Sequence, residues 1–419
     1  MVKMIVQEKL RKYAELLDNF EKNNSNTIPL CAAETIVSNL VKAPLRSSFS
    51  ERYIKSGIKN FDASKEFIGS QYIYPVYQLI SEICLELFGA QYADARPLSG
   101  MNAVLTSLMS ITNHGDNILL LHPDAGAHES YPQICDRLGL KTTYIPFDLD
   151  NIRYDIDETN KLLNNQKYKA IVIPPSDLID QPPLDKLIIP IETIVFYDCT
   201  QSFGLIASGH HLNPMKLSNQ VILLGGTHKT ISGPTCGLIL CNDKHLSTIL
   251  ENKITPIYVR NPHPHHIASL LMALIEFIEY GTEYMKNIIT TSNTLGCLLS
   301  KHGFSVKKID KLHYSNTHQL FISLNKNDAI NMEKNARLLN ISLDKKSKKM
   351  YGDAGIRIGV QAITRLGWGK EELDILASIL SKMKYEHLSP SIIKMASQLR
   401  GRDKLIYTID ASAHEFLNT

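Results

Sequence analysis

Hydrophobic positions along the chain follow two different periods, and the change between them predicts the order of the elements. Between Val6 and Phe20 apolar side chains recur at helical spacing, so we expect an amphipathic helix that ends near the turn-rich residues 23–26. A second helix is predicted at 76–89, where it ends on a glycine. Short, mostly apolar runs typical of strands buried on both faces of a mostly parallel sheet follow at residues 117–121, 170–173, 193–197, 221–224 and 238–240.

A smaller α/β unit is predicted after a long helix that begins near residue 267. Short runs at 319–324, 336–339 and 356–358 would supply its strands, and a helix follows at 371–383. The chain has 419 residues, of which 44% are hydrophobic, which is enough for a large core. We therefore expect a helical arm at 1–44, a large domain at 45–270 and a small C-terminal domain with a helical tail at 271–419.

Composition excludes several classes of protein. A formal net charge of +3 gives no reason to expect nucleic acid or an acidic membrane surface as a partner. The apolar stretch at 267–278 is too short to span a bilayer, and the first residues lack a signal-peptide core. Seven cysteines without a Cys-x-x-Cys pair predict neither a disulfide framework nor a metal site. We expect a reduced, cytoplasmic protein.

The strongest chemical signal is a lysine in a turn of small residues directly after a predicted strand. Residues 221–234 read VILLGGTHKTISGP, which places Lys229 in the turn. A desolvated lysine there has a lowered pKa, and its neutral amine can form an imine with an aldehyde. From this stretch alone, an exposed loop lysine is an equally good interpretation.

Two further features make the signal more specific. Asp198 follows the predicted strand at 193–197, at the edge where open α/β sheets bind ligands, although a helix N-cap explains an isolated aspartate equally well. A carboxylate there would keep the ring nitrogen of pyridoxal phosphate protonated, so that the ring accepts electrons. Ser99, Gly100 and Met101 open a helix whose backbone N–H groups suit the cofactor phosphate.

Together these features resemble the serine hydroxymethyltransferase family, in fold type I of the pyridoxal-phosphate enzymes. The resemblance runs from about residue 28 to 385. It rests on LCAAET at 30–35, RYIKSG at 52–57, LFGAQY at 87–92, PLSG at 97–100, THKT at 227–230, GP at 233–234, GIRIG at 355–359 and AITR at 362–365. It implies an aspartate aminotransferase-like α/β fold, with a large domain around a mostly parallel sheet, a smaller C-terminal domain, and a homodimer with shared active sites.

The resemblance implies a role for each matching residue. Lys229 would carry the cofactor as an imine, Arg357 would bind the substrate carboxylate as a bidentate fork, and Tyr53 would reach the partner subunit's site. Taken alone, Arg357 would be an ordinary ion-pair residue. The remaining implied contacts are Asp198 at the ring nitrogen, His128 on the ring face (alone, a structural histidine), Ser176 near the phenolic oxygen, Ser99, Gly100 and Met101 at the phosphate, Gln201, Thr227, His228 and Arg260 around the cofactor, and Glu34 at the substrate.

Departures from the family pattern are concentrated at residues that handle protons and folate. Lys55 stands where the family carries a catalytic glutamate, which reverses the charge of that side chain. The other replacements in the site are Phe67 for a tyrosine, Ala33 for a serine, Gln201 for a histidine and Thr235 for an arginine.

Two whole segments also differ from the family. The loop at 256–266 replaces a glycine-rich loop, and Arg260 could substitute there for lost backbone donors. It contains His263, His265 and His266, but no carboxylate partner is evident and we predict no metal. The segment 343–349, LDKKSKK, lies where the family has its folate pocket, and as a basic run it is expected to form a solvated face.

These departures spare the cofactor residues, so we infer aldol or transaldolase-type chemistry at Cα of a small amino acid, with an aldehyde as second substrate and without folate. Retained Arg357 favours a substrate with a free carboxylate. Three alternatives stay open. The first is a true serine hydroxymethyltransferase. The second is a pyridoxal-phosphate decarboxylase, racemase, transaminase or acyl-condensing enzyme, and the third is a non-catalytic binding protein of this fold.

Overall fold

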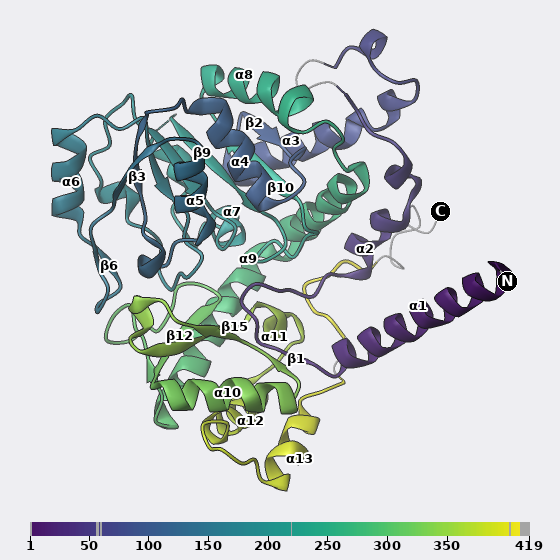
Figure 1. Ribbon diagram of the computed structural model, residues 1–419, viewed down its shortest axis with the longest axis vertical. Helices are drawn as coiled ribbons and strands as arrows, with labels where there is room; N and C mark the ends of the chain where they lie inside the picture. Colours follow the sequence, from purple (N-terminus) through teal and green to yellow (C-terminus); the bar gives the residue numbers. More distant parts are fainter. Residues whose placement is uncertain (1, 56–57, 59–60, 219, 402–403, 411–419) are drawn as a thin grey trace.

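The computed structural model describes residues 2–55, 58, 61–218, 220–401 and 404–410. Residues 56–57 of the predicted tyrosine segment and 411–419 of the predicted tail lie outside the described residues. Two α/β units lie one above the other in Figure 1, and the long helix α9 (Pro264–Lys301) passes from one to the other. The expected boundary at 270/271 therefore lies inside a continuous helix.

The chain begins with α1 (Val2–Ser25), which lies apart from the central sheet, and continues with α2 (Asn39–Lys42). The further helices of the large unit are α3 (Tyr74–Phe88), α4 (Gly100–Ile111), α5 (Ser130–Arg137), α6 (Ile156–Asn165), α7 (Phe203–Ala207) and α8 (Lys244–Lys253). The predicted glycine stop of α3 is confirmed, because Gly89 caps it in a left-handed conformation, φ 66°, that glycine adopts without strain.

The central sheet has seven strands in the order β2-β10-β9-β8-β7-β3-β4. Only β10 runs antiparallel to its neighbours, so the expected mostly parallel sheet is confirmed. The strands are β2 (Tyr92–Asp94), β3 (Asn117–Leu120), β4 (Lys141–Tyr144), β7 (Ala170–Ile173), β8 (Ile194–Asp198), β9 (Val221–Gly226) and β10 (Gly237–Cys241). A separate hairpin pairs β5 (Phe147–Asp148) with β6 (Arg153–Tyr154).

Alternate residues of these strands enter two different cores, which explains their continuous apolar sequence. In β8, Val195 and Tyr197 pack in one core with α3, α7 and α9, whereas Ile194 and Phe196 pack in the other with α4, α5 and α8. Successive side chains of a strand point to opposite faces, so a strand covered on both faces needs apolar residues at every position. The carboxyl ends of β8 and β9 therefore lie side by side at one edge of a buried sheet.

The small unit is a second sheet in the order β11-β12-β15-β14, antiparallel throughout. Its strands are β11 (Ser305–Val306), β12 (Gln319–Leu324), β14 (Asp344–Lys346) and β15 (Ala354–Gly359), and its helices are α10 (Lys326–Leu338), α11 (Gln361–Arg365), α12 (Lys370–Lys382) and α13 (Pro390–Gln398). The predicted strand at 336–339 is wrong, since α10 covers most of it. Ala336 and Leu339, three positions apart, are buried on one side of the helix end, whereas Leu338 is exposed. The strand that follows is β13 (Ile341–Ser342), paired with β1 (Ile28–Pro29).

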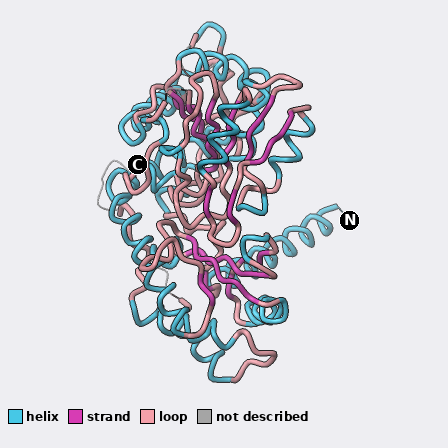
Figure 2. Tube along the Cα trace, turned by 90° about the vertical axis from the view of Figure 1, so that its left-hand side faces the viewer, coloured by secondary structure: helices cyan, strands magenta, loops and turns pink. Residues whose placement is uncertain are grey.

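Helix α1 projects away from the rest of the molecule in both views (Figures 1 and 2). Its apolar stripe includes Val6, Leu10, Tyr13, Leu17 and Phe20, and each of these side chains is exposed. In the part of the chain described here, no helix is long and apolar enough to cross a membrane.

Candidate active site

Lys229 lies in a tight turn beyond the end of β9, at the edge of the central sheet. The turn is closed by backbone hydrogen bonds from Ser232 N–H to the Lys229 carbonyl at 3.0 Å and from Gly233 N–H to Thr227 at 3.1 Å. The Lys229 side chain is only 8% exposed, and no hydrogen bond or ion pair to a described residue holds its amine. Burial, reinforced by the charge of Arg357, lowers the pKa of Lys229 to about 8, which makes the neutral amine accessible near physiological pH.

Asp198 is the last residue of β8, the strand beside β9, and neighbouring residues fix its carboxylate by hydrogen bonds. Oδ1 accepts hydrogen bonds from Thr200 N–H at 2.9 Å and from the Thr200 hydroxyl at 2.5 Å. Oδ2 accepts from the buried Tyr131 hydroxyl at 2.8 Å, and burial and this carboxylate raise the pKa of Tyr131. Asp198 is thus fixed as an acceptor, with a lone pair of Oδ2 left for one further donor.

His128 and Ser176 flank this edge of the sheet. The backbone N–H of His128 donates to Pro174 at 3.0 Å, and its Nδ1 accepts from Ser130 N–H at 3.3 Å. Partial desolvation lowers the pKa of His128, so its exposed imidazole is neutral at pH 7. A neutral ring can stack on an aromatic cofactor without cancelling the charge of Asp198.

The start of α4 offers free backbone donors beside β9. Ser99 is the N-cap, and its hydroxyl and carbonyl accept the N–H groups of Asn102 and Ala103. In the described structure the N–H groups of Gly100 and Met101 have no protein acceptor. A Cβ on Gly100 would lie 2.5 Å from the backbone nitrogen of Gly226, so only glycine lets α4 approach β9 this closely.

Two neighbours of Lys229 complete this end of the site. The Thr227 hydroxyl donates to the Pro234 carbonyl at 2.8 Å, so it supports the turn. His228 Nδ1 is buried without a partner among the described residues, and burial lowers the pKa of His228 to about 4. This neutral nitrogen remains available to a ligand.

Arg357, on β15, approaches the same edge from the small unit and is only 3% exposed. Nη1 donates to the Ser176 carbonyl at 2.6 Å and Nη2 donates to Asp344 Oδ2 at 2.6 Å. The positive charge of Arg357 also helps to lower the pKa of Lys229, so the two groups lie within electrostatic range of each other. The sheet edge therefore holds a desolvated amine, a fixed carboxylate, free backbone donors and a guanidinium.

Comparison with known proteins agrees with this arrangement. A sequence model of the serine hydroxymethyltransferase family matches residues 6–380. The chain belongs to the serine hydroxymethyltransferase family. It is 29% identical over 380 residues to the serine hydroxymethyltransferase of Methanopyrus kandleri, covering 88% of this chain and 87% of that protein. It is 32% identical over 367 residues to that of Picrophilus torridus, covering 84% and 83%.

A solved structure shows the same fold over the whole chain. The L-threonine transaldolase from Pseudomonas fluorescens superposes with a TM-score of 0.90 at 21% identity, covering 100% of this chain and 97% of that one. The predicted fold type I is thereby confirmed. Membership of the serine hydroxymethyltransferase family also confirms that the chain is related to pyridoxal-phosphate-dependent enzymes.

The predicted solvated face at 343–349 is wrong for two of its four lysines. In β14, Asp344 and Lys346 point inward while Lys345 points outward to Glu333. Lys348 is 8% exposed and donates to the Ala127 carbonyl at 2.7 Å and to the fully buried Asp177. A strand alternates its faces, so half of a basic run can be buried if it finds carboxylates there.

Tyr53, Lys55 and Phe67 pack together without a contact to Lys229 among the described residues. Lys55 and Phe67 depart from the serine hydroxymethyltransferase pattern, and Tyr53 is part of the same segment. The Lys55 ammonium lies 4.3 Å from the centroid of the Phe67 ring, and Tyr53 meets the same ring edge-on at 5.4 Å. Tyr53 and Phe67 also line a cavity of about 590 Å³. No contact in the described chain joins Tyr53 or Lys55 to Lys229, Asp198 or Arg357.

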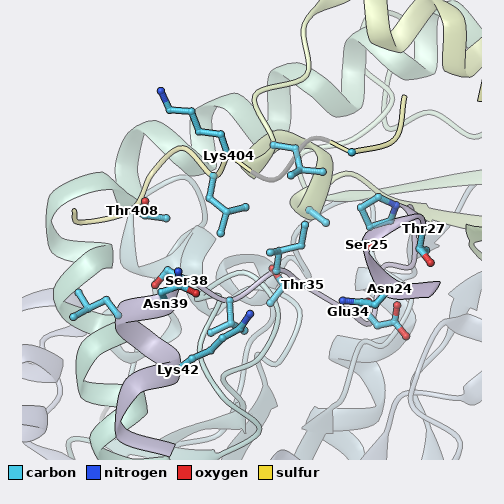
Figure 3. A pocket seen from close by; sticks show the side chains of 18 of the residues that line it. Asn24, Ser25, Thr27, Glu34, Thr35, Ser38, Asn39, Lys42, Lys404 and Thr408 are labelled. Carbon is cyan, nitrogen blue, oxygen red and sulfur yellow. The ribbon is translucent and has the colours of Figure 1, made fainter. Parts of the chain in front are cut away.

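Glu34 lies on a different cavity, of about 750 Å³, between the N-terminal segment and residues near the C-terminus (Figure 3). Thr35 and Lys42 line it with Glu34, and Lys404, from the segment near the C-terminus, lines its other side (Figure 3). Thr35 also hydrogen-bonds Ser232 at 3.3 Å, so the cavity begins one contact from the Lys229 turn. The structure thus places the Glu34 side chain next to the site rather than within it.

Arg260 is exposed on its loop, and the three nearby histidines pack their rings at 4.6–5.5 Å. A search of the described residues finds no group of three or more His, Cys, Asp or Glu side chains that could hold a metal.

Several site residues were not predicted from the sequence. Tyr131 is one, because only the fold brings it to Asp198. Gln319 is another: its amide donates to Gln201 at 2.9 Å and to the Ser176 carbonyl at 3.1 Å, which fixes the predicted Gln201 in place. Asp177 is the third. The sequence could have predicted it, because it lies next to Ser176 in the loop that follows the buried strand β7.

Proposed function

We propose that this protein binds pyridoxal phosphate through Lys229 and acts at Cα of a small amino acid. The observation that supports this best is the buried Lys229 amine without a partner among the described residues, at the sheet edge that Arg357 also reaches. Lys229 can hold the aldehyde of the cofactor, and the guanidinium matches the carboxylate of an α-amino acid.

The residues present fit the cofactor. Asp198 keeps a lone pair for the ring nitrogen, and Tyr131 and Thr200 hold its carboxylate in place. The N–H groups of Gly100 and Met101 can donate hydrogen bonds to the phosphate oxygens at the positive end of α4. The orphaned nitrogen of His228, the residue before Lys229, is a further group that a ligand could contact.

When bound, pyridoxal phosphate withdraws electrons from the Cα of an attached amino acid, so that a Cα bond can break. The protein's own residues would decide which bond breaks. Arg357 fixes the carboxylate, and the bond that stands perpendicular to the ring is then set by the side-chain pocket. Neutral His128 would cover the ring face and exclude water from it.

We further propose that the reaction is an aldol or transaldolase-type C–C bond reaction without folate. The Lys55–Phe67 contact supports this, because an ammonium held over an aromatic ring cannot serve as the carboxylic acid that the family carries there. The partly buried Lys346 and the buried Lys348 likewise alter the segment that corresponds to the family's folate pocket. The relatives' name, serine hydroxymethyltransferase, keeps that activity as the second candidate.

A homodimer with shared sites belongs to the same proposal. The exposed apolar stripe of α1 has no covering in the single chain, and a second copy of the chain would bury it. Tyr53 and Lys55, which lie away from Lys229 in their own chain, would then serve the neighbouring site.

The test is a visible-absorbance titration of the purified holoenzyme with glycine, serine and threonine, each with and without tetrahydrofolate. We expect amino acids to change the cofactor spectrum and tetrahydrofolate to have no further effect. A folate-dependent change with glycine would refute the folate-independent reaction and favour a hydroxymethyltransferase.

Release of acetaldehyde from threonine in the presence of an aromatic aldehyde, measured with a coupled alcohol dehydrogenase, tests the transaldolase reaction. The solved structure of an L-threonine transaldolase with this fold makes threonine the first choice of substrate. Lys229→Ala is the control and should release none. Product analysis with labelled serine, glycine and alanine separates decarboxylation, racemisation and transamination.

A further inference from the structure

One edge of the Arg357 guanidinium is only half bonded. Nη1 donates to the Ser176 carbonyl at 2.6 Å and lies 3.4 Å from Asp177 Oδ1. On the other side, Nη2 donates to Asp344, while the buried Nε has no partner among the described residues. Nε and Nη2 form the side-on edge of a guanidinium, and a carboxylate can bond to both at once. Asp344 satisfies only one of them.

Asp344 has a second cation within reach. Lys346 Nζ lies 2.8 Å from the same Oδ2 atom that accepts from Arg357. The two residues are two positions apart in β14, so their side chains share one face of the strand. Asp344 is 28% exposed and Arg357 only 4%, so Asp344 can withdraw outward without disturbing the buried bonds behind the arginine.

The charges of this cluster do not balance. Arg357, Lys346 and Lys348 supply three positive charges, and Asp177 and Asp344 supply two negative charges. Lys348 already donates to Asp177 and to the Ala127 carbonyl, and its side chain is only 8% exposed, so its charge is directed at Asp177. Buried cations without an equal number of anions are costly, and one additional carboxylate would neutralise the cluster.

The Arg357 cluster lies at the edge of the sheet that also carries the lysine. Arg357 bonds to the carbonyl of Ser176, which follows β7, and the neighbouring strands β8 and β9 lead to Asp198 and Lys229. The positive charge of Arg357 helps to lower the pKa of Lys229, which agrees with this placement. A carboxylate bound by Arg357 would therefore lie at the same edge of the sheet as Lys229.

We propose that Asp344 is an internal carboxylate that the substrate displaces, so that an α-amino carboxylate takes the Nε–Nη2 edge of Arg357 while Asp344 moves onto Lys346. This deepens the proposed function and rests on it. It makes Asp344 and Lys346 residues that determine specificity for substrates with a free carboxylate. Amides and amino alcohols, which cannot displace Asp344, are excluded.

The experiment compares the wild type with Asp344→Asn, Lys346→Met and the double variant, using glycine and glycinamide as probes in spectral titrations of the holoenzyme. If Asp344 occupies the edge about nine-tenths of the time, its removal tightens glycine binding about tenfold, and glycinamide binding stays unchanged. Lys346→Met removes the alternative partner of Asp344, so it weakens glycine binding, but it has no effect once Asp344 is replaced. Lys345→Met, which changes the outward neighbour, is the matched control and leaves the affinity at the wild-type value.

Acetate binding, measured by calorimetry, gives a readout that needs no reaction at the cofactor. If glycine leaves the wild-type spectrum unchanged, the proposed function fails, but Asp344→Asn still tightens acetate binding if the exchange is correct. If Asp344→Asn binds both glycine and acetate no more tightly than the wild type, the exchange is refuted. Asp344→Ser provides the same comparison if the asparagine variant does not fold.

Discussion

Replacing Lys348 by Met tests whether the basic run at 343–349 is buried beside the active site. The change keeps the length of the side chain but removes its bonds to the Ala127 carbonyl and to Asp177. Asp177 keeps the Tyr351 hydroxyl at 2.9 Å, Arg357 at 3.4 Å and Lys346 at 3.5 Å. Breaking a buried ion pair so that a charge is left alone costs about 3–5 kcal/mol. Since Asp177 retains two cations, we expect about 1.5–3 kcal/mol, the range of a hydrogen bond to a charged group.

Urea unfolding followed by circular dichroism gives the free energies of unfolding for this comparison. Lys345→Met is the control, because its exposed pair with Glu333 should contribute about 0–1 kcal/mol. The double variant Asp177→Asn with Lys348→Met should lose less stability than Lys348→Met alone, because no buried carboxylate is left short of a partner. Equal stabilities of the Lys348 and Lys345 variants would refute the burial of Lys348 on Asp177.

Three further predictions follow from the site and from α1. Burial lowers the pKa of Lys229 from 10.5 to about 8, so the rate of cofactor uptake by the apoenzyme should rise as the pH passes about 8 and the amine loses its proton. Stopped-flow measurements check this, and a midpoint near pH 10 would contradict the burial of the amine. Asp198→Asn should weaken cofactor binding at least about tenfold, since a neutral amide cannot pair with a protonated ring nitrogen, and equilibrium dialysis showing wild-type affinity would exclude that role. Leu10→Asp with Leu17→Asp should dissociate the proposed dimer, because each leucine buried at an interface contributes about 1.5–3 kcal/mol; sedimentation at unchanged mass would show that α1 does not form the interface.

The cofactor end of the site could be predicted from the sequence because its residues follow buried strands. Lys229 and Asp198 come after neighbouring parallel strands, and the carboxyl ends of such strands meet at one edge. Tyr131 could not be predicted, since its position near Asp198 depends on how α5 packs against the sheet. The strand predicted at 336–339 failed because a four-residue run with three apolar residues, at the end of an amphipathic helix, is too short to show a period that distinguishes a helix from a strand.

The basic run shows a different limit. By composition, the four lysines between 345 and 349 look like one solvated group. In the structure, Lys345 and Lys349 are exposed, whereas Lys346 and Lys348 turn inward to Asp177. The buried pair needs Asp177, which lies far away in the sequence. Charge complementarity between distant segments can therefore be recognised only when the fold brings them together.

The central claim is that Lys229 carries pyridoxal phosphate, and covalent trapping tests it most directly. Borohydride reduction of the holoenzyme fixes an imine permanently, and peptide mass spectrometry then locates the added group. We predict the modification on the peptide that contains Lys229, with none elsewhere and none in Lys229→Ala. Modification of a different lysine, or an unmodified Lys229 peptide in the reduced holoenzyme, would contradict the account.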